Sequence, residues 1–133
     1  MNAVDTNILV RFIVKDDMRQ ANIAYNLFRR IEKNREQLFV PIVVVLEVMW
    51  VLESLYDSPR ADTVAVISNL LAMPIFQFET QPVIQKFITS ARKNNFDLAD
   101  LFLAHSAAHA HCDKVYTFDK KASKFKLFEL LPA

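Results

Sequence analysis

Three acidic residues lie within or directly beside apolar segments, where a carboxylate is not expected. Asp5 interrupts the apolar opening "NAVDTNILV", and Asp119 directly follows the apolar stretch "VYTF". Glu47 is the only polar residue in the segment 42–52. A helix that is apolar on all sides is expected to be buried, where a carboxylate is costly unless it is paired or holds a metal. No Lys or Arg stands at helical spacing from Glu47, so the alternatives are a distant arginine partner and a bound cation.

Two further acids, Asp97 and Asp100, lie three residues apart in "DLADLFLA". Taken alone, they are explained as a helix N-cap and a first-turn carboxylate that suits the helix dipole. Asp5 and Asp119 could likewise cap the segments that follow them. Capping does not explain Glu47, however, and carboxylates that converge on one cleft repel each other unless a divalent cation neutralises them. Oxygen ligands select Mg²⁺ or Mn²⁺, and such sites perform phosphodiester hydrolysis well.

Strands and helices are predicted to alternate along the chain. Short strands are expected at 2–5, where the strand should be buried, and at 37–41, 75–78, 114–118 and 126–130. Helical spacing of apolar residues, with proline and cap signals, predicts helices at 6–13, 16–34, 41–56, 58–72, 83–95 and 97–111. This order indicates an α/β fold, a parallel sheet covered on both faces, in a single domain over residues 1–133. Ligands of such folds bind beyond the carboxyl ends of the strands, where Asp5 and Asp119 are predicted to lie.

The composition excludes several classes of protein. The chain has no glycine, which excludes glycine-dependent phosphate loops and argues against nucleotide-cofactor enzymes. Cys112 is the only cysteine, so no intramolecular disulfide can form. The chain shows neither a signal segment nor an apolar run long enough to span a membrane, and we therefore expect a cytoplasmic protein without membrane association.

Charge and hydropathy bear on the partners of the protein. The net charge of +1 gives no overall attraction for nucleic acid. Several lysines gather near the C-terminus, where a solvated rim and a phosphate-binding track remain equally open: Lys114, Lys120, Lys121, Lys124 and Lys126. The hydrophobic fraction is 53% without any glycine, above the usual ~45–50%. Some apolar surface is therefore expected to bind a partner.

Four features occur in one order: "VDTNILV", a Glu within an apolar helix, "DLAD" opening a helix, and "VYTFD". In that order they resemble the PIN-domain ribonucleases, most closely the VapC toxins of bacterial and archaeal toxin–antitoxin pairs. The resemblance covers nearly the whole chain. It implies a three-layer α/β/α sandwich with a mostly parallel central sheet. It also implies Mg²⁺- or Mn²⁺-dependent cleavage of RNA, a VapB-like antitoxin as partner, and a homodimer.

The resemblance also assigns roles to individual residues. By position, the residues that would bind metal and catalyse are Asp5, Glu47 and Asp100, with Asp119 as a fourth, more variable acid. Asp97 corresponds to a common acidic position. Thr6 and Asn7 would orient the first carboxylate, and Thr117 would do similar work. Two positions depart from the family pattern, His111 where glycine is frequent and Leu98 where phenylalanine is frequent, but neither is an acid.

Three other interpretations account for parts of the sequence. The segment "HSAAHAHC" places His105 and His109 one turn apart, as zinc ligands can be, but no companion Cys or His exists elsewhere in the chain. Asp5 could be the nucleophile of a phosphotransfer enzyme, although such enzymes want a second acid two residues later, where Asn7 stands. The chain could also be a non-catalytic α/β interaction module, in which the acids only cap helices.

Overall fold

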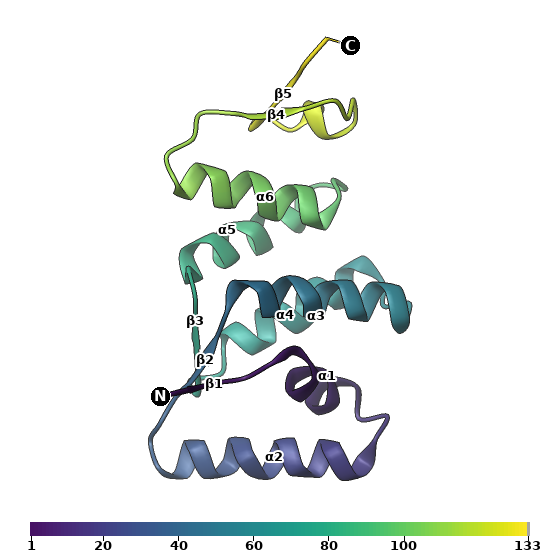
Figure 1. Cartoon of the computed structure of the whole chain (residues 1–133). Helices are drawn as coiled ribbons and strands as arrows, with labels where there is room; N and C mark the ends of the chain where they lie inside the picture. Colours follow the sequence, from purple (N-terminus) through teal and green to yellow (C-terminus); the bar gives the residue numbers. More distant parts are fainter. Residues whose placement is uncertain (133) are drawn as a thin grey trace. The chain divides into compact units, whose positions relative to one another are not determined.

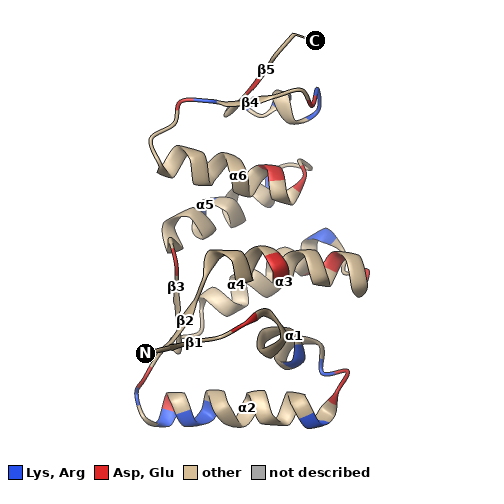
Figure 2. Ribbon diagram, viewed as in Figure 1, with Lys and Arg blue, Asp and Glu red and all other residues tan. Residues whose placement is uncertain are grey.

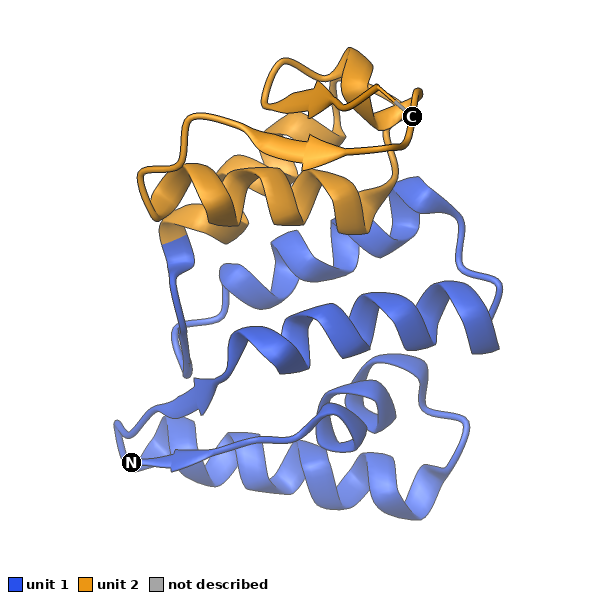
Figure 3. Cartoon of the chain, turned by 45° about the horizontal axis from the view of Figure 1, so that its top comes forward, with its two compact units in different colours: residues 1–81 blue, residues 82–133 orange. Residues whose placement is uncertain are grey.

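The computed structural model describes residues 1–132 (Figure 1). Contacts along the chain divide it into two compact units, Met1–Gln81 and Pro82–Ala133, which are coloured separately in Figure 3. The expectation of a single domain over residues 1–133 stays a prediction.

The first unit contains a sheet of three parallel strands in the order β1-β2-β3. Its elements follow the predicted order: β1 Asn2–Ala3, α1 Thr6–Val14, α2 Met18–Lys33, β2 Leu38–Val40, α3 Ile42–Leu55, α4 Arg60–Leu71 and β3 Phe76–Phe78. Val40, on the central strand, is fully buried. The ring of Phe28 on α2 meets the ring of Phe76 on β3 edge to face, with 5.2 Å between centroids. Such contacts fix α2 against the sheet.

Local signals explain how the helices of this unit begin. Asp5 and Asp17 are the N-caps of α1 and α2, and the side chain of each accepts a hydrogen bond from the backbone N–H three residues later. Pro41 precedes α3 and offers no side-chain cap. Glu79 takes over that role, because its Oε1 accepts the N–H of Ile42 at 3.0 Å. One orphan donor of α3 is therefore satisfied by a residue far along the chain.

A buried strand was predicted at 2–5, and the prediction of burial is wrong. Strand β1 covers only Asn2–Ala3, and both of its residues are exposed. It pairs with β2 alone, so it is an edge strand of this sheet. Val4, the next residue, is buried. The core contact of this segment is therefore made just after the strand ends.

Except for its first residue, helix α5 Gln81–Ala91 belongs to the second unit. The same unit contains α6 Leu98–His109, β4 Val115–Thr117, the 3₁₀ helix η1 Ala122–Lys124, and β5 Phe128–Leu130. Strands β4 and β5 pair in parallel. Phe87 of α5 and Phe102 of α6 are buried, with ring centroids 5.0 Å apart. Helix α5 was predicted to continue to residue 95. It ends four residues earlier, at Ala91, and the chain forms a turn at residues 92 and 93.

All strand pairs recorded within residues 1–132 are parallel. The prediction of an α/β fold with parallel strands is therefore confirmed. Among the helices of residues 1–132, none is both long enough and apolar enough to cross a membrane.

Candidate metal centre

Asp5 stands between β1 and α1 with an extended backbone. Its Oδ1 accepts the N–H of Ile8 at 3.2 Å, which caps the helix. Within residues 1–132 this is the only hydrogen bond recorded for the carboxylate, so Oδ2 remains available to a ligand. Capping and ligand binding are therefore compatible at Asp5.

The prediction that Glu47 is buried is wrong. Glu47 is exposed, and α3 also presents Val43, Leu46 and Trp50 to solvent, the last with 62% of its surface accessible. Only the face of α3 that carries residues such as Val48 packs into the core. An all-apolar helix sequence does not require burial on every side, because an exposed apolar stripe also serves a partner. Figure 2 shows α3 in tan apart from its acidic residues.

Glu47 is nevertheless held in a defined place. Its Oε2 accepts a hydrogen bond from the hydroxyl of Thr6 at 2.8 Å. Thr6 is buried, with 7% of its surface accessible, and it is the first residue of α1. Since Asp5 is the N-cap of the same helix, this bond brings Glu47 to the N-terminus that Asp5 caps. Thr6 was predicted to orient Asp5, and the structure shows that its side chain orients Glu47 instead, because the hydroxyl points toward α3.

No cationic side chain neutralises Glu47 within residues 1–132, where the one recorded bond to this carboxylate comes from Thr6. Arg11 of α1 is engaged with other residues: its guanidinium donates to Gln20 at 2.8 Å and to Asp16 at 3.1 Å. The hydrogen bond from Tyr56, followed by the charge of Arg11, holds the pKa of Asp16 below its usual range. The alternative of a distant arginine partner for Glu47 is therefore not supported.

A cavity of about 300 Å³ opens beside Asp5 in the first unit. Asn7 lines it together with Asp5 and Arg11. Asn7 is exposed there, so its side-chain amide can meet a ligand that enters beside the Asp5 carboxylate. The structure thus gathers Asp5, Thr6, Asn7 and Glu47 around the start of α1.

The second unit holds the other predicted acids. Asp97 is the N-cap of α6, and its Oδ1 accepts the N–H of Asp100 at 3.1 Å. Burial raises the pKa of Asp100 above its usual range, and the charges of Asp97 and Asp119 raise it further. Asp97 and Asp119 therefore lie close enough to repel Asp100, which is the situation that a bound cation relieves.

Asp119 follows β4 and caps the 3₁₀ helix η1. Its Oδ1 accepts the backbone N–H groups of Lys121 at 2.8 Å and Ala122 at 3.1 Å. The backbone N–H of Asp119 itself donates to the hydroxyl oxygen of Thr117 at 3.0 Å. This contact ties the backbone of Asp119 to the side chain of Thr117, and Oδ2 of Asp119 is left without a recorded hydrogen bond in residues 1–132.

Comparison with known proteins identifies the family. The model of the PIN domain matches residues 3–127. The chain belongs to the PIN domain family. It is 26% identical over 124 residues to "VapC ribonuclease" of Aquifex aeolicus (strain VF5), a match that covers 93% of this chain and 91% of that protein. The resemblance drawn from the four sequence features, and the PIN-type α/β fold that it implied, are thereby confirmed.

The acids of this PIN domain fall into two sets, Asp5 and Glu47 in the first unit and Asp97, Asp100 and Asp119 in the second. In the part of the chain that the structure describes, no three His, Cys, Asp or Glu side chains are grouped closely enough to hold a metal ion. This finding applies to the segment "HSAAHAHC" as well as to the acids. The donor chemistry of the acids nevertheless suits a cation. Among residues 1–132, every predicted ligand offers a carboxylate oxygen without a recorded hydrogen bond, and oxygen donors suit Mg²⁺ and Mn²⁺.

Sequence reasoning missed two features of this PIN domain. The bond between Thr6 and Glu47 joins residues 41 positions apart, and only the place of Thr6 directly after an Asp hinted at it. His105 drew attention as a possible zinc ligand, whereas in the structure it lines a cavity with three lysines. Two of these, Lys86 and Lys93, lie outside the C-terminal lysine group, so no run of charge marked them.

Replacing Asp97 by asparagine is expected to lower the pKa of Asp100. The change removes the charge that follows burial among the causes of the raised pKa, while asparagine caps a helix as well as aspartate does. Because the raised pKa makes ionisation of Asp100 costly in the folded state, the wild type loses stability as the pH rises from the ordinary towards the raised pKa. In Asp97→Asn the pKa of Asp100 should lie closer to its ordinary value, so the pH range over which stability is lost should be narrower. A ¹³C NMR titration of the side-chain carboxyl measures the shift.

The matched control for this titration is Asp113→Asn, which removes an exposed acid of the same unit that does not act on Asp100. Its Asp100 pKa should equal that of the wild type. An unchanged pKa in Asp97→Asn would contradict the coupling between the two carboxylates.

Proposed function

We propose that this PIN-domain protein is an endoribonuclease toxin that hydrolyses RNA phosphodiester bonds with the help of Mg²⁺ or Mn²⁺. Two findings support the RNA substrate: membership of the PIN domain family, and similarity over most of the chain to a protein named as a ribonuclease. By analogy with the family, the products carry 5′-phosphate and 3′-hydroxyl ends.

The same proposal assigns the cation to Asp5, Glu47 and Asp100, with Asp119 as a fourth ligand. The observation that carries it is the hydrogen bond by which Thr6 holds Glu47 at the helix N-terminus that Asp5 caps, and the charges of Asp97 and Asp119, which after burial raise the pKa of Asp100, add support. Repulsion among these carboxylates costs the protein stability, and a divalent cation would turn that cost into binding energy. The oxygens that Asp5 and Glu47 leave free are further support, since ligation would not break the bonds that hold either side chain.

The residues of the chain would then act as follows. Thr6 keeps Glu47 in one orientation through its 2.8 Å hydrogen bond, and Thr117 does the same for the backbone of Asp119. Such supporting contacts fix ligand geometry and are typically worth ~10–100-fold in metal affinity. A divalent cation, when bound, supplies a water of lowered pKa and charge stabilisation for the leaving oxygen. Asn7, which lines the cavity beside Asp5, can donate a hydrogen bond to a phosphate oxygen of the RNA.

Removal of divalent cations tests this function. The purified protein should cleave a fluorescently labelled single-stranded RNA in Mg²⁺ or Mn²⁺, lose that activity in EDTA, and regain it when the cation is restored. Three results would argue otherwise. Cleavage that persists in EDTA would contradict the proposed requirement for a divalent cation. No cleavage under any condition favours the interaction module. Transfer of phosphate from the substrate to the protein, giving an acid-stable phosphoprotein that does not form in Asp5→Asn, favours the nucleophilic aspartate.

We also propose a homodimer and a VapB-like antitoxin as partners, in the cytoplasm. Support comes from the exposed apolar side chains of α3, namely Val43, Leu46, Trp50 and Leu55. A stripe of this kind is unusual on a surface that binds nothing. Light scattering of the purified protein tests the dimer, since a mass of 15.4 kDa, that of one chain, would contradict it.

A further inference from the structure

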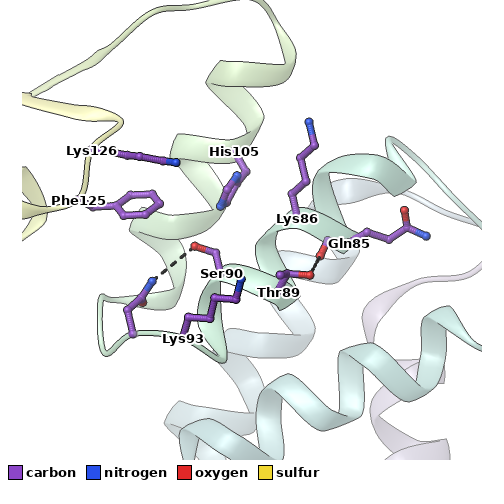
Figure 4. A pocket seen from close by; sticks show the side chains of 9 residues that line it. Gln85, Lys86, Thr89, Ser90, Lys93, His105, Phe125 and Lys126 are labelled. Atoms are coloured by element: carbon purple, nitrogen blue, oxygen red, sulfur yellow. Dashed lines mark hydrogen bonds between the residues drawn. The ribbon is translucent and has the colours of Figure 1, made fainter.

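The second unit contains a cavity of about 470 Å³ that shares no residue with the acidic set. It lies between α5, α6 and the segment that leads into β5 (Figure 4). The residues that matter here are Lys86, Ser90, Lys93, His105, Phe125 and Lys126. We call it the lysine cavity. Volumes of ~300–1,000 Å³ are typical of small-molecule sites.

The lysine cavity is positively charged. Three lysines line it, and no Asp or Glu is among its lining residues. They come from different segments: Lys86 from α5, Lys93 from the turn after α5, and Lys126 from the segment before β5. Lys114 donates to the backbone oxygen of Lys126 at 2.6 Å, which steadies that segment. Three cations in one hollow without a counter-charge favour an anionic ligand.

Polar groups with unused hydrogen-bonding capacity add to this charge. Nε2 of His105 is buried and has no hydrogen-bond partner among residues 1–132. Burial, followed by the charges of Lys86 and Lys126, lowers the pKa of His105, so the imidazole is neutral at neutral pH. Ser90 accepts a hydrogen bond from Asn94 at 3.5 Å, and no bond recorded within residues 1–132 uses its own O–H. A ligand rich in acceptor oxygens would use these donors.

An aromatic ring forms another part of the wall. In Figure 4, His105 lies between Phe125 and Lys126 on one side and Lys86 on the other, with Ser90 and Lys93 below them in the view. The ring of Phe125 lies 5.9 Å from that of His105 and is partly exposed. A phosphate alone would not need an aromatic wall or this volume, whereas a nucleotide brings both a phosphate and a flat base.

We propose that the lysine cavity binds one nucleotide of single-stranded RNA, with its phosphate among Lys86, Lys93 and Lys126 and its base against Phe125. The inference rests on the proposed function in taking RNA as the ligand. It adds a binding subsite that holds the RNA strand without taking part in the chemistry.

The test compares the binding of an RNA hexanucleotide in EDTA, measured by fluorescence anisotropy, between wild type and the triple variant K86Q/K93Q/K126Q. The triple variant should bind at least about tenfold more weakly, and each lost phosphate contact should lower the salt dependence of binding by roughly 0.7 in the logarithmic slope. The control K15Q/R19Q/K33Q removes the same charge from exposed positions of the first unit and should bind within about twofold of wild type. In the wild type, the imidazole resonances of His105 should move when the hexanucleotide is added.

Several results would overturn the proposal: equal binding by wild type and K86Q/K93Q/K126Q, equal losses in the two triple variants, or no binding by wild type. If inorganic phosphate moves the His105 resonances as far as adenosine monophosphate does, the base has no place in the site. If the monophosphate binds but the hexanucleotide does not, RNA is not the ligand. Mg²⁺-dependent cleavage by wild type is measured separately. If the lysine cavity proves not to bind RNA but wild type still cleaves RNA, only the proposed subsite is contradicted. If K86Q/K93Q/K126Q binds RNA more weakly than wild type but wild type cleaves no RNA, only the proposed ribonuclease function is contradicted.

Discussion

Replacing Asp5 by asparagine is expected to lower RNA cleavage by about 1000-fold or more while the protein stays folded. A bound cation contributes several kcal/mol to such a reaction, and each ~1.4 kcal/mol corresponds to a factor of ten in rate. Asparagine retains an oxygen that can accept the N–H of Ile8, so the cap of α1 survives. The charge needed by a cation is lost. Initial rates of cleavage of a labelled RNA, with circular dichroism as a check of folding, measure the effect.

Asp17→Asn is the matched control. Asp17 caps α2 as Asp5 caps α1, accepting the N–H of Gln20 at 3.1 Å, and it is exposed in the same unit. Its activity should equal that of wild type. If Asp5→Asn keeps full activity, Asp5 does no more than cap the helix. If both variants lose activity to the same extent, the effect belongs to helix capping.

A second large effect is expected for Glu47→Gln, again a loss of about 1000-fold in cleavage. Glutamine can still accept the hydroxyl hydrogen of Thr6 through its amide oxygen, so the contact between α1 and α3 persists. Because Glu47 is exposed, the change should alter the midpoint of thermal unfolding by only a few degrees. Cleavage rates at increasing Mg²⁺ show whether the defect lies in the cation.

Glu53→Gln serves as the control for this variant, since Glu53 is another exposed glutamate of α3. It should leave cleavage within about twofold of wild type, the range expected of a surface substitution. Wild-type activity in Glu47→Gln would remove this residue from the site. A strongly destabilised Glu47→Gln would instead make Glu47 a structural anchor for Thr6.

Many elements of this fold are determined by residues that are close to one another in the sequence. Helix α1 begins after Asp5, and helix α6 begins after Asp97, because each carboxylate reaches a backbone N–H only three residues ahead. Pro41 marks the start of α3 for an equally local reason, since proline suits the first turn of a helix. The parallel pairing of strands follows from their alternation with helices. Features that depend on neighbours in the chain were therefore predictable.

The parts that sequence alone did not reveal depend on contacts between distant segments. Apart from Glu47, the segment 42–52 of α3 is apolar on all sides, and that pattern is the same whether a side faces the core or a partner. The burial of Glu47 was therefore predicted wrongly. Its bond from Thr6 and the cap that Glu79 provides for α3 join positions about 40 residues apart. His105 and the lysines around it come together only because α5, α6 and the segment before β5 pack against one another.

We expect carboxylates of this PIN domain to hold a divalent cation for RNA hydrolysis. X-ray diffraction from crystals soaked in Mn²⁺ tests it most directly, because anomalous scattering locates the ion independently of any assay. We expect an anomalous peak within ~2.0–2.3 Å of oxygens from Asp5, Glu47 and Asp100, at distances typical of hard cations with carboxylates. No peak, or a peak held by other residues, would contradict it.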